Sequence, residues 1–148
     1  MNAPAEFKFL STNRRVREDR RFVAGKGHYV ADIVRPGMLH AAIVQAPVTA
    51  AKIVSIDASK ALAMPGVHYV LTGEELAAAV EPMMNGLDTP KVQRYSLAVG
   101  QVRYNGEWVA IVVADNRALA EDAVELVEVQ YEELPHVMDP AGESYLRQ

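Results

Sequence analysis

Gly25, Lys26 and Gly27 are the residues whose types first suggest chemistry, because a glycine-rich loop with a lysine can hold a phosphate group. A phosphate-binding loop of the form G-x-x-x-x-G-K-[ST] requires a hydroxyl residue after the lysine and then a helix. Here glycine follows Lys26, and the next segment is predicted to be extended. A dinucleotide-binding G-x-G-x-x-G pattern fails because position 30 is valine. The two glycines are therefore predicted to form a tight turn before a strand, with Asp32 closing the next turn.

Metal-ligating side chains are the second candidate chemistry. The four histidines are His28, His40, His68 and His136. None has another histidine at i+2, i+3 or i+4, and none has a carboxylate at a metal-ligand spacing, so no metal site is predicted. The chain has no cysteine, which excludes disulfides, thiolate ligands and cysteine nucleophiles from it. The lack of cysteine fits a reducing compartment, and we expect a cytoplasmic protein.

Carboxylates cluster near the end of the sequence, and paired carboxylates can act as general acids and bases. The cluster consists of Glu121, Asp122, Glu125 and Glu128. These positions fall on one side of a predicted helix, so the pattern indicates a solvated helix face. The serines do not occur in a nucleophile motif, and Trp108 begins an apolar run in which a packing role is expected. The residues alone therefore show no catalytic constellation.

Charge is distributed unevenly along the chain, whose net charge is −4. Residues 1–35 carry eight Lys or Arg against four Asp or Glu, whereas residues 36–148 carry seven against fifteen. Nucleic-acid binding is not predicted, because Glu18 and Asp19 interrupt the basic residues and the isoelectric point is acidic. The arm is instead predicted to lie on an acidic partner or on the acidic surface of its own domain. The candidate partner-interface residues are Arg14, Arg15, Arg17, Arg20 and Arg21.

Apolar periodicity predicts the elements that surround these residues. Strands are predicted at 37–47, 51–57, 67–72, 107–114 and 127–134. Helices are predicted at 58–64, 73–80 and 115–127; Asp57 caps the first, a Thr72–Glu75 capping box the second, and Asp115 or Asn116 the third. The third helix is predicted to bury Leu119, Ala123, Leu126 and Val127. This order indicates an α+β fold, a mixed β-sheet with helices packed on one face.

The predicted organisation is one domain over residues 14–140, between a tail at 1–13 and a tail at 141–148. Within the domain, residues 14–35 form a basic arm and residues 81–100 form a long irregular loop, which is the segment expected to be mobile or to touch a partner. No run of residues approaches the roughly 18–20 apolar positions of a membrane helix, so no membrane insertion is expected.

Four segments, in this order, carry a resemblance to a known family. They are RVREDRRFVAGKGHYVADI (15–33), RPGMLHAAIVQAP (35–47), AKIVSIDASKALAMPGVHYVLTGEEL (51–76) and VRYNGEWVAIVVADNRALAEDAVELVEVQYEELPHVMDP (102–140). The chain resembles the N-terminal a/b hammerhead domain of the molybdenum hydroxylases, the xanthine dehydrogenase and aldehyde oxidase family. Its opening is closest in style to the large chain of aerobic carbon monoxide dehydrogenase. Two places depart from the family pattern: QAPVTAA after the first strand, and Trp108 where the family usually has proline.

The resemblance implies a hammerhead fold and a supporting role. In this family the molybdopterin cofactor, expected in its cytosine dinucleotide form, and the glutamate base belong to later domains of the large subunit. No catalytic, cofactor-binding or metal-binding residue is therefore assigned to this chain. The assembled enzyme would hydroxylate an aldehyde, an N-heterocycle or a related carbon with water as the oxygen source.

The implied partners are the cofactor-binding large chain or the remainder of the molybdenum subunit, an iron–sulfur subunit with 2Fe–2S clusters and a FAD subunit. The chain would be a hammerhead domain or a separately encoded part of a split subunit. The alternative is a stand-alone α+β interaction module that has lost its catalytic partners.

Overall fold

The computed structural model describes residues 19–83 and 94–136, and the chain divides into two units, Met1–Pro36 and Gly37–Gln148. Within the described ranges, no helix combines the length and the apolar character needed to cross a bilayer.

The described part of the first unit contains two short helical elements and no strand. Helix α1 (Asp19–Val23) ends in a turn in which Gly25 has a φ of 69°, a value that favours glycine. The 3-10 helix η1 (Val30–Asp32) follows, and the Asp32 carboxylate accepts a hydrogen bond from the Tyr29 amide at 2.8 Å. The turn at Gly25 and the closing role of Asp32 are confirmed. The strand expected directly after Gly27 is wrong, because η1 interrupts the extended segment and the first strand begins only at His40.

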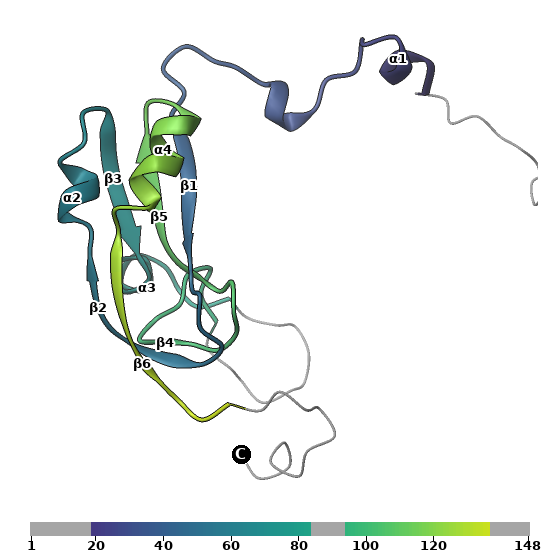
Figure 1. Cartoon of the computed structure of the whole chain (residues 1–148). Helices are drawn as coiled ribbons and strands as arrows, with labels where there is room; N and C mark the ends of the chain where they lie inside the picture. The colour runs from purple at the N-terminus through teal and green to yellow at the C-terminus, as the bar shows by residue number, and fades with distance from the viewer. Residues whose placement is uncertain (1–18, 84–93, 137–148) are drawn as a thin grey trace, which may run out of the picture. The chain divides into compact units, whose positions relative to one another are not determined.

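The second unit contains two three-stranded sheets (Figure 1). Strand β5 (Trp108–Ala114) lies between β1 (His40–Gln45) and β3 (Val67–Thr72) in one sheet. Strand β2 (Ala51–Asp57) lies between β4 (Gln101–Val102) and β6 (Glu128–Glu133) in the other. The helices are α2 (Ser59–Leu62), α3 (Gly73–Ala79) and α4 (Arg117–Val124).

The α+β class is confirmed, and the arrangement of strands differs from the single mixed sheet expected. All pairings among the named strands are antiparallel. Both edges of β5 are occupied by β1 and β3, and both edges of β2 by β4 and β6, so the two central strands cannot share a ladder. The short strand β4 was not predicted.

Most of the buried side chains are alanines and valines. In one cluster, Ala61 of α2 and Ala123 of α4 pack with Val44, Val70 and Val112 from the three strands of the first sheet, so both helices cover the same face. A second cluster lies around Val102 and Val109. The prediction of helices on one face is therefore confirmed for α2 and α4.

The buried face of α4 differs slightly from the predicted one. Ala120 and Ala123 of α4 are fully buried, whereas Leu119 is only half-buried. The helix ends at Val124 and not at Val127 as predicted, so Leu126 and the nearly buried Val127 lie in the turn before β6. The methyl side chains of the two alanines allow the helix backbone to approach the sheet closely. The predicted cap is correct, since the Asn116 side chain accepts a hydrogen bond from the Leu119 amide at 2.9 Å.

Replacement of Val112 by alanine should lower the free energy of unfolding by about 1–4 kcal/mol, because Val112 is fully buried in the central strand and the change leaves a cavity. Chemical denaturation of the purified chain measures the loss. Val54→Ala is the matched control, since Val54 is 60% exposed and should change stability by less than about 0.5 kcal/mol. Equal losses for the two variants would contradict the assignment of Val112 to the core.

Candidate interaction site

A groove of about 320 Å³ lies between β2, the start of α3 and the segment that precedes β4. Ile53, Val54 and Ile56 contribute apolar side chains from β2. Thr72, Glu74 and Glu75 contribute polar groups from the end of β3 and the first turn of α3. The groove therefore lies where the two sheets of the second unit approach each other.

The backbone of the groove is fixed by one close approach and one bulge. Gly73 lies so close to the chain at Ala98 that a Cβ atom there would stand 1.8 Å from the Ala98 carbonyl oxygen. On the opposite side, the pairing of β2 with β6 shifts register between Ile53 and Ser55, which leaves Val54 exposed. The Ile53 amide donates to the Gly100 carbonyl at 2.9 Å, which ties the bulge to the same segment.

The predicted capping box of α3 forms one rim of the groove. The Glu75 carboxylate accepts hydrogen bonds from the Thr72 amide at 2.9 Å and from the Thr72 hydroxyl at 3.0 Å. These two bonds, the amide bond first, hold the pKa of Glu75 below its ordinary value of 4.5. The Tyr69 hydroxyl donates to the other Glu75 oxygen at 3.3 Å, and the negative charge of Glu75 raises the pKa of Tyr69.

The groove suits an apolar or cationic side chain better than an anion. Its lining combines aliphatic side chains of β2 with two carboxylates, Glu74 and Glu75. A phosphate group or the pyrophosphate of a pterin cofactor would be repelled by these charges. In residues 19–83 and 94–136 no charged side chain is buried, and no group of three metal-ligating residues comes together. The groove is therefore suited to binding a side chain of another protein segment. It does not fit the anionic molybdopterin cofactor.

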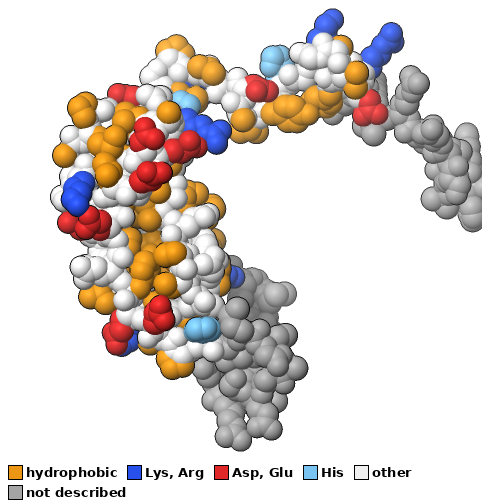
Figure 2. All heavy atoms as spheres, in the orientation of Figure 1, with side chains coloured by type: hydrophobic (Ala, Val, Ile, Leu, Met, Phe, Trp, Pro, Cys, Tyr) orange, Lys and Arg blue, Asp and Glu red, His pale blue; other side chains and the backbone are white. Residues whose placement is uncertain are grey.

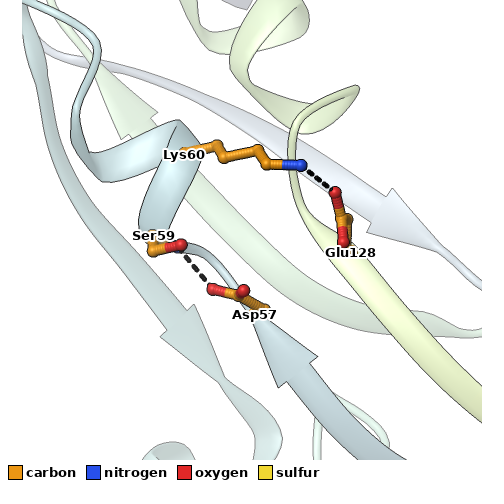
Figure 3. Close-up of polar contacts among 4 residues, drawn as sticks. All are labelled: Asp57, Ser59, Lys60 and Glu128. Atoms are coloured by element: carbon orange, nitrogen blue, oxygen red, sulfur yellow. Dashed lines mark hydrogen bonds and ion pairs between the residues drawn. The ribbon is translucent and has the colours of Figure 1, made fainter.

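A polar cluster joins α2 to the second sheet (Figure 3). Lys60 of α2 forms an ion pair with Glu128 at the start of β6, and this bond is the main cause that raises the pKa of Lys60. Asp57, at the end of β2, accepts a hydrogen bond from the Ser59 amide at 2.9 Å, which lowers the pKa of Asp57. Because these groups are exposed, the cluster adds little to the stability of the fold, and its main effect is to orient α2. The N-cap of α2 is Ala58 and not the predicted Asp57, which lies one residue earlier and accepts its bond from the first helical residue.

The acidic residues suspected of acid–base chemistry lie on the surface. Glu121, Asp122, Glu125 and Glu128 are all exposed. Glu121 pairs with Arg117 one turn earlier at 2.7 Å. Glu121 and Asp122 lie on α4 and confirm a solvated helix face, whereas Glu125 is the C-cap of the helix and Glu128 lies in β6.

One polar pair was not apparent from the sequence. His68 Nε2 lies 2.7 Å from the Asp115 carboxylate, although 47 positions separate the two residues. Both side chains are exposed, and the antiparallel pairing of β3 with β5 brings them together. Sequence spacing carries no signal for such a pair, because the register of the sheet creates it.

The predicted interface arginines are placed in part. Arg20 and Arg21 lie on α1 and are exposed, and the Arg21 guanidinium lies 5.1 Å from the centre of the Phe22 ring. Arg14, Arg15 and Arg17 lie outside the described residues. Within the described part of the first unit, α1 and η1 bury no side chain.

Comparison with known proteins gives the class of the chain. Residues 24–135 match the family model for the a/b hammerhead domain of aldehyde oxidase and xanthine dehydrogenase. The chain is 50% identical over 126 residues to the carbon monoxide dehydrogenase large chain of Hydrogenophaga pseudoflava, covering 84% of this chain and 15% of that one. It is 43% identical over 126 residues to the nicotine 6-hydroxylase large subunit of Paenarthrobacter nicotinovorans, covering 83% and 15%.

A solved structure agrees with these relatives. Quinoline 2-oxidoreductase from Pseudomonas putida 86 superposes with a TM-score of 0.74 and 44% sequence identity, over 80% of this chain and 16% of that one. The chain belongs to the aldehyde oxidase and xanthine dehydrogenase a/b hammerhead family, as its sequence motifs indicated. It spans about one sixth of the length of the relatives it matches.

The capping box should contribute a pH-dependent part of stability. Because the pKa of folded Glu75 is lowered, its stabilisation is complete above about pH 4.5 and is lost as the pH falls through the lower folded value. Glu75→Gln cannot titrate, so the stability difference between wild type and this variant should shrink below pH 4.5. Unfolding curves between pH 3 and 7 measure the difference. Glu74→Gln, which leaves the capping box intact, should keep the wild-type profile; a constant difference for Glu75→Gln would contradict the role of the carboxylate.

Proposed function

We propose that this chain is the hammerhead part of a molybdenum hydroxylase and supports assembly with the cofactor-bearing and iron–sulfur parts. The observation that carries the proposal is the family match over residues 24–135 in relatives about six times longer. Most of each relative is therefore a different part of the protein. The acidic rim of the groove supports a structural role, because it disfavours an anionic cofactor at that site.

The proposed reaction of the assembled enzyme is the hydroxylation of an aldehyde, an N-heterocycle or a related carbon, with water as the oxygen source. Two of the relatives described above are named for N-heterocyclic compounds, nicotine and quinoline. These names support an N-heterocycle as the proposed substrate class. Molybdopterin, in its cytosine dinucleotide form, would supply the redox chemistry from another part of the enzyme. FAD and 2Fe–2S clusters on partner subunits would carry electrons onward, in the cytoplasm. No step of the reaction is assigned to the residues described here.

Purification of the chain under native conditions tests the proposal. An affinity-tagged copy at its natural expression level should carry or co-purify a molybdenum-containing assembly. Metal analysis should find molybdenum in proportion to the chain, and an oxidised extract should show pterin fluorescence. A stable assembly that contains neither would favour the alternative, a stand-alone interaction module.

The basic arm is proposed to contact an acidic surface in that assembly. Arg20→Glu with Arg21→Glu should lower the yield of the complex, since each reversal turns an attraction into a repulsion. The difference in complex yield between this variant and wild type should be largest at low salt and should decrease as added ions screen the charges. Arg103→Glu with Arg117→Glu on the second unit is the control, because it changes the net charge by the same amount. Its yield of complex should be higher than that of the arm variant. An unchanged yield for the arm variant at low ionic strength would contradict the contact.

A further inference from the structure

The turn that leads into β5 contains an asparagine followed directly by a glycine. The Glu107 amide donates a hydrogen bond to the Tyr104 carbonyl at 3.2 Å, so Asn105 and Gly106 are the two central residues of this turn. Gly106 has a φ of 85°, the conformation that a type II turn requires at its third position. Asn105 is exposed. Its side-chain amide is therefore open to water at a sharp bend of the backbone.

Deamidation is the reaction that this dipeptide permits. The Gly106 nitrogen, after losing its proton to the solvent, attacks Cγ of Asn105. The N–Cγ bond forms, the Cγ–Nδ2 bond breaks, and ammonia leaves after taking up a proton. Water then opens the cyclic imide at either carbonyl, which gives aspartate or isoaspartate. Glycine favours the attack because it has no side chain to hinder its nitrogen. Both products place a carboxylate where the chain had a neutral amide.

The fold engages the nitrogen that would have to attack. The Gly106 amide donates a hydrogen bond to the Ala46 carbonyl at 2.8 Å, and the Ala46 amide donates to the Glu107 carbonyl at 2.9 Å. Ala46 is only 2% exposed and belongs to the second core cluster, so these two bonds are sheltered from water. A nitrogen that donates its proton to a buried carbonyl retains that proton. The turn must therefore open before Asn105 can react.

The side chain of Glu107 holds the same turn closed. One of its carboxylate oxygens accepts a hydrogen bond from the Arg103 amide at 2.5 Å, and the other lies 3.6 Å from the Arg103 guanidinium. The negative charge of Glu107 also opposes removal of the proton from the neighbouring Gly106 amide. Figure 2 shows Asp and Glu side chains at several places on the visible face of the second unit. A carboxylate at position 105 would add to a surface that is already acidic.

We propose that Asn105 is a deamidation site that the Gly106–Ala46 hydrogen bond protects, and that it is modified when the turn opens. Isoaspartate lengthens the backbone by one methylene group, so the turn bond from Glu107 to Tyr104 and the bond to Ala46 cannot both re-form in their original register. Because ammonia is lost, the asparagine does not return. The modification therefore reports past opening of this end of the β1–β5 ladder. It depends on residues of the second unit alone.

Incubation of the full chain at mildly alkaline pH, in native buffer and in guanidinium chloride, tests the proposal. Peptide mass spectrometry follows the conversion of Asn105, and electron-transfer fragmentation distinguishes isoaspartate from aspartate. Asn105 should react about tenfold or more slowly in the folded chain, because only the opened fraction of molecules is reactive. Asn85 also precedes a glycine and lies outside the described residues; in guanidinium chloride its rate should match that of Asn105. Equal rates for Asn105 in the two buffers would overturn the protection, and no conversion in guanidinium chloride would overturn the site.

Replacement of Glu107 by alanine tests whether opening of the turn sets the rate. Glu107→Ala removes the carboxylate that holds the Arg103 amide and leaves the reacting groups unchanged. In the folded chain its Asn105 should deamidate about threefold or more faster than in wild type, and in guanidinium chloride at the wild-type rate. Glu121→Ala is the matched control, because it removes the same charge from another i,i+4 pair, with Arg117, and should keep the wild-type rate in both buffers. An unchanged folded-state rate for Glu107→Ala would overturn the control of this site by the turn.

Discussion

The occupation of both edges of β5 is the constraint on which the second unit depends. β1 and β3 complete the hydrogen bonding of this strand. Its residues Ala110 and Val112 are fully buried in one apolar cluster, and Val109 is fully buried in the other. The other sheet must therefore form around β2. Ile56 and Val129 pack against both clusters and join the sheets. With a core of small side chains, the fold depends on close backbone approach rather than on a few large residues.

The sequence predicted the elements that have strong local signals. Apolar runs indicated β1, β2, β3 and β5, and side-chain spacing indicated the caps at Thr72 and Asn116, because these depend on residues three positions apart. The division into two sheets could not be predicted, since it follows from bulges and from which strand edges are already occupied. The short α1 and β4 also lack a local signal. Ala120 was missed on α4 because alanine contributes little to an apolar pattern, although its small size is what the packing requires.

The candidate site illustrates the same limit. The acidic rim at Glu74 and Glu75 follows from the predicted helix start, but the groove itself needs Gly73 against Ala98, a contact across 25 positions. The basic arm was apparent from charge alone. Its internal order was not, because the stacking of Phe22 on Tyr29 depends on the turn at Gly25 and on the space left by Gly27.

The arm also bears on the choice between an enzyme part and a stand-alone module. Val23, Val30 and Val34 of the arm are each more than 80% exposed, and exposed aliphatic side chains promote aggregation unless another surface covers them. The same side chains have a function if a second surface covers them. The cost of ordering the turn is then already met by Phe22, Gly27 and Tyr29, so burial of the valines contributes to binding. The physical character of the arm thus favours a chain that belongs to a larger assembly.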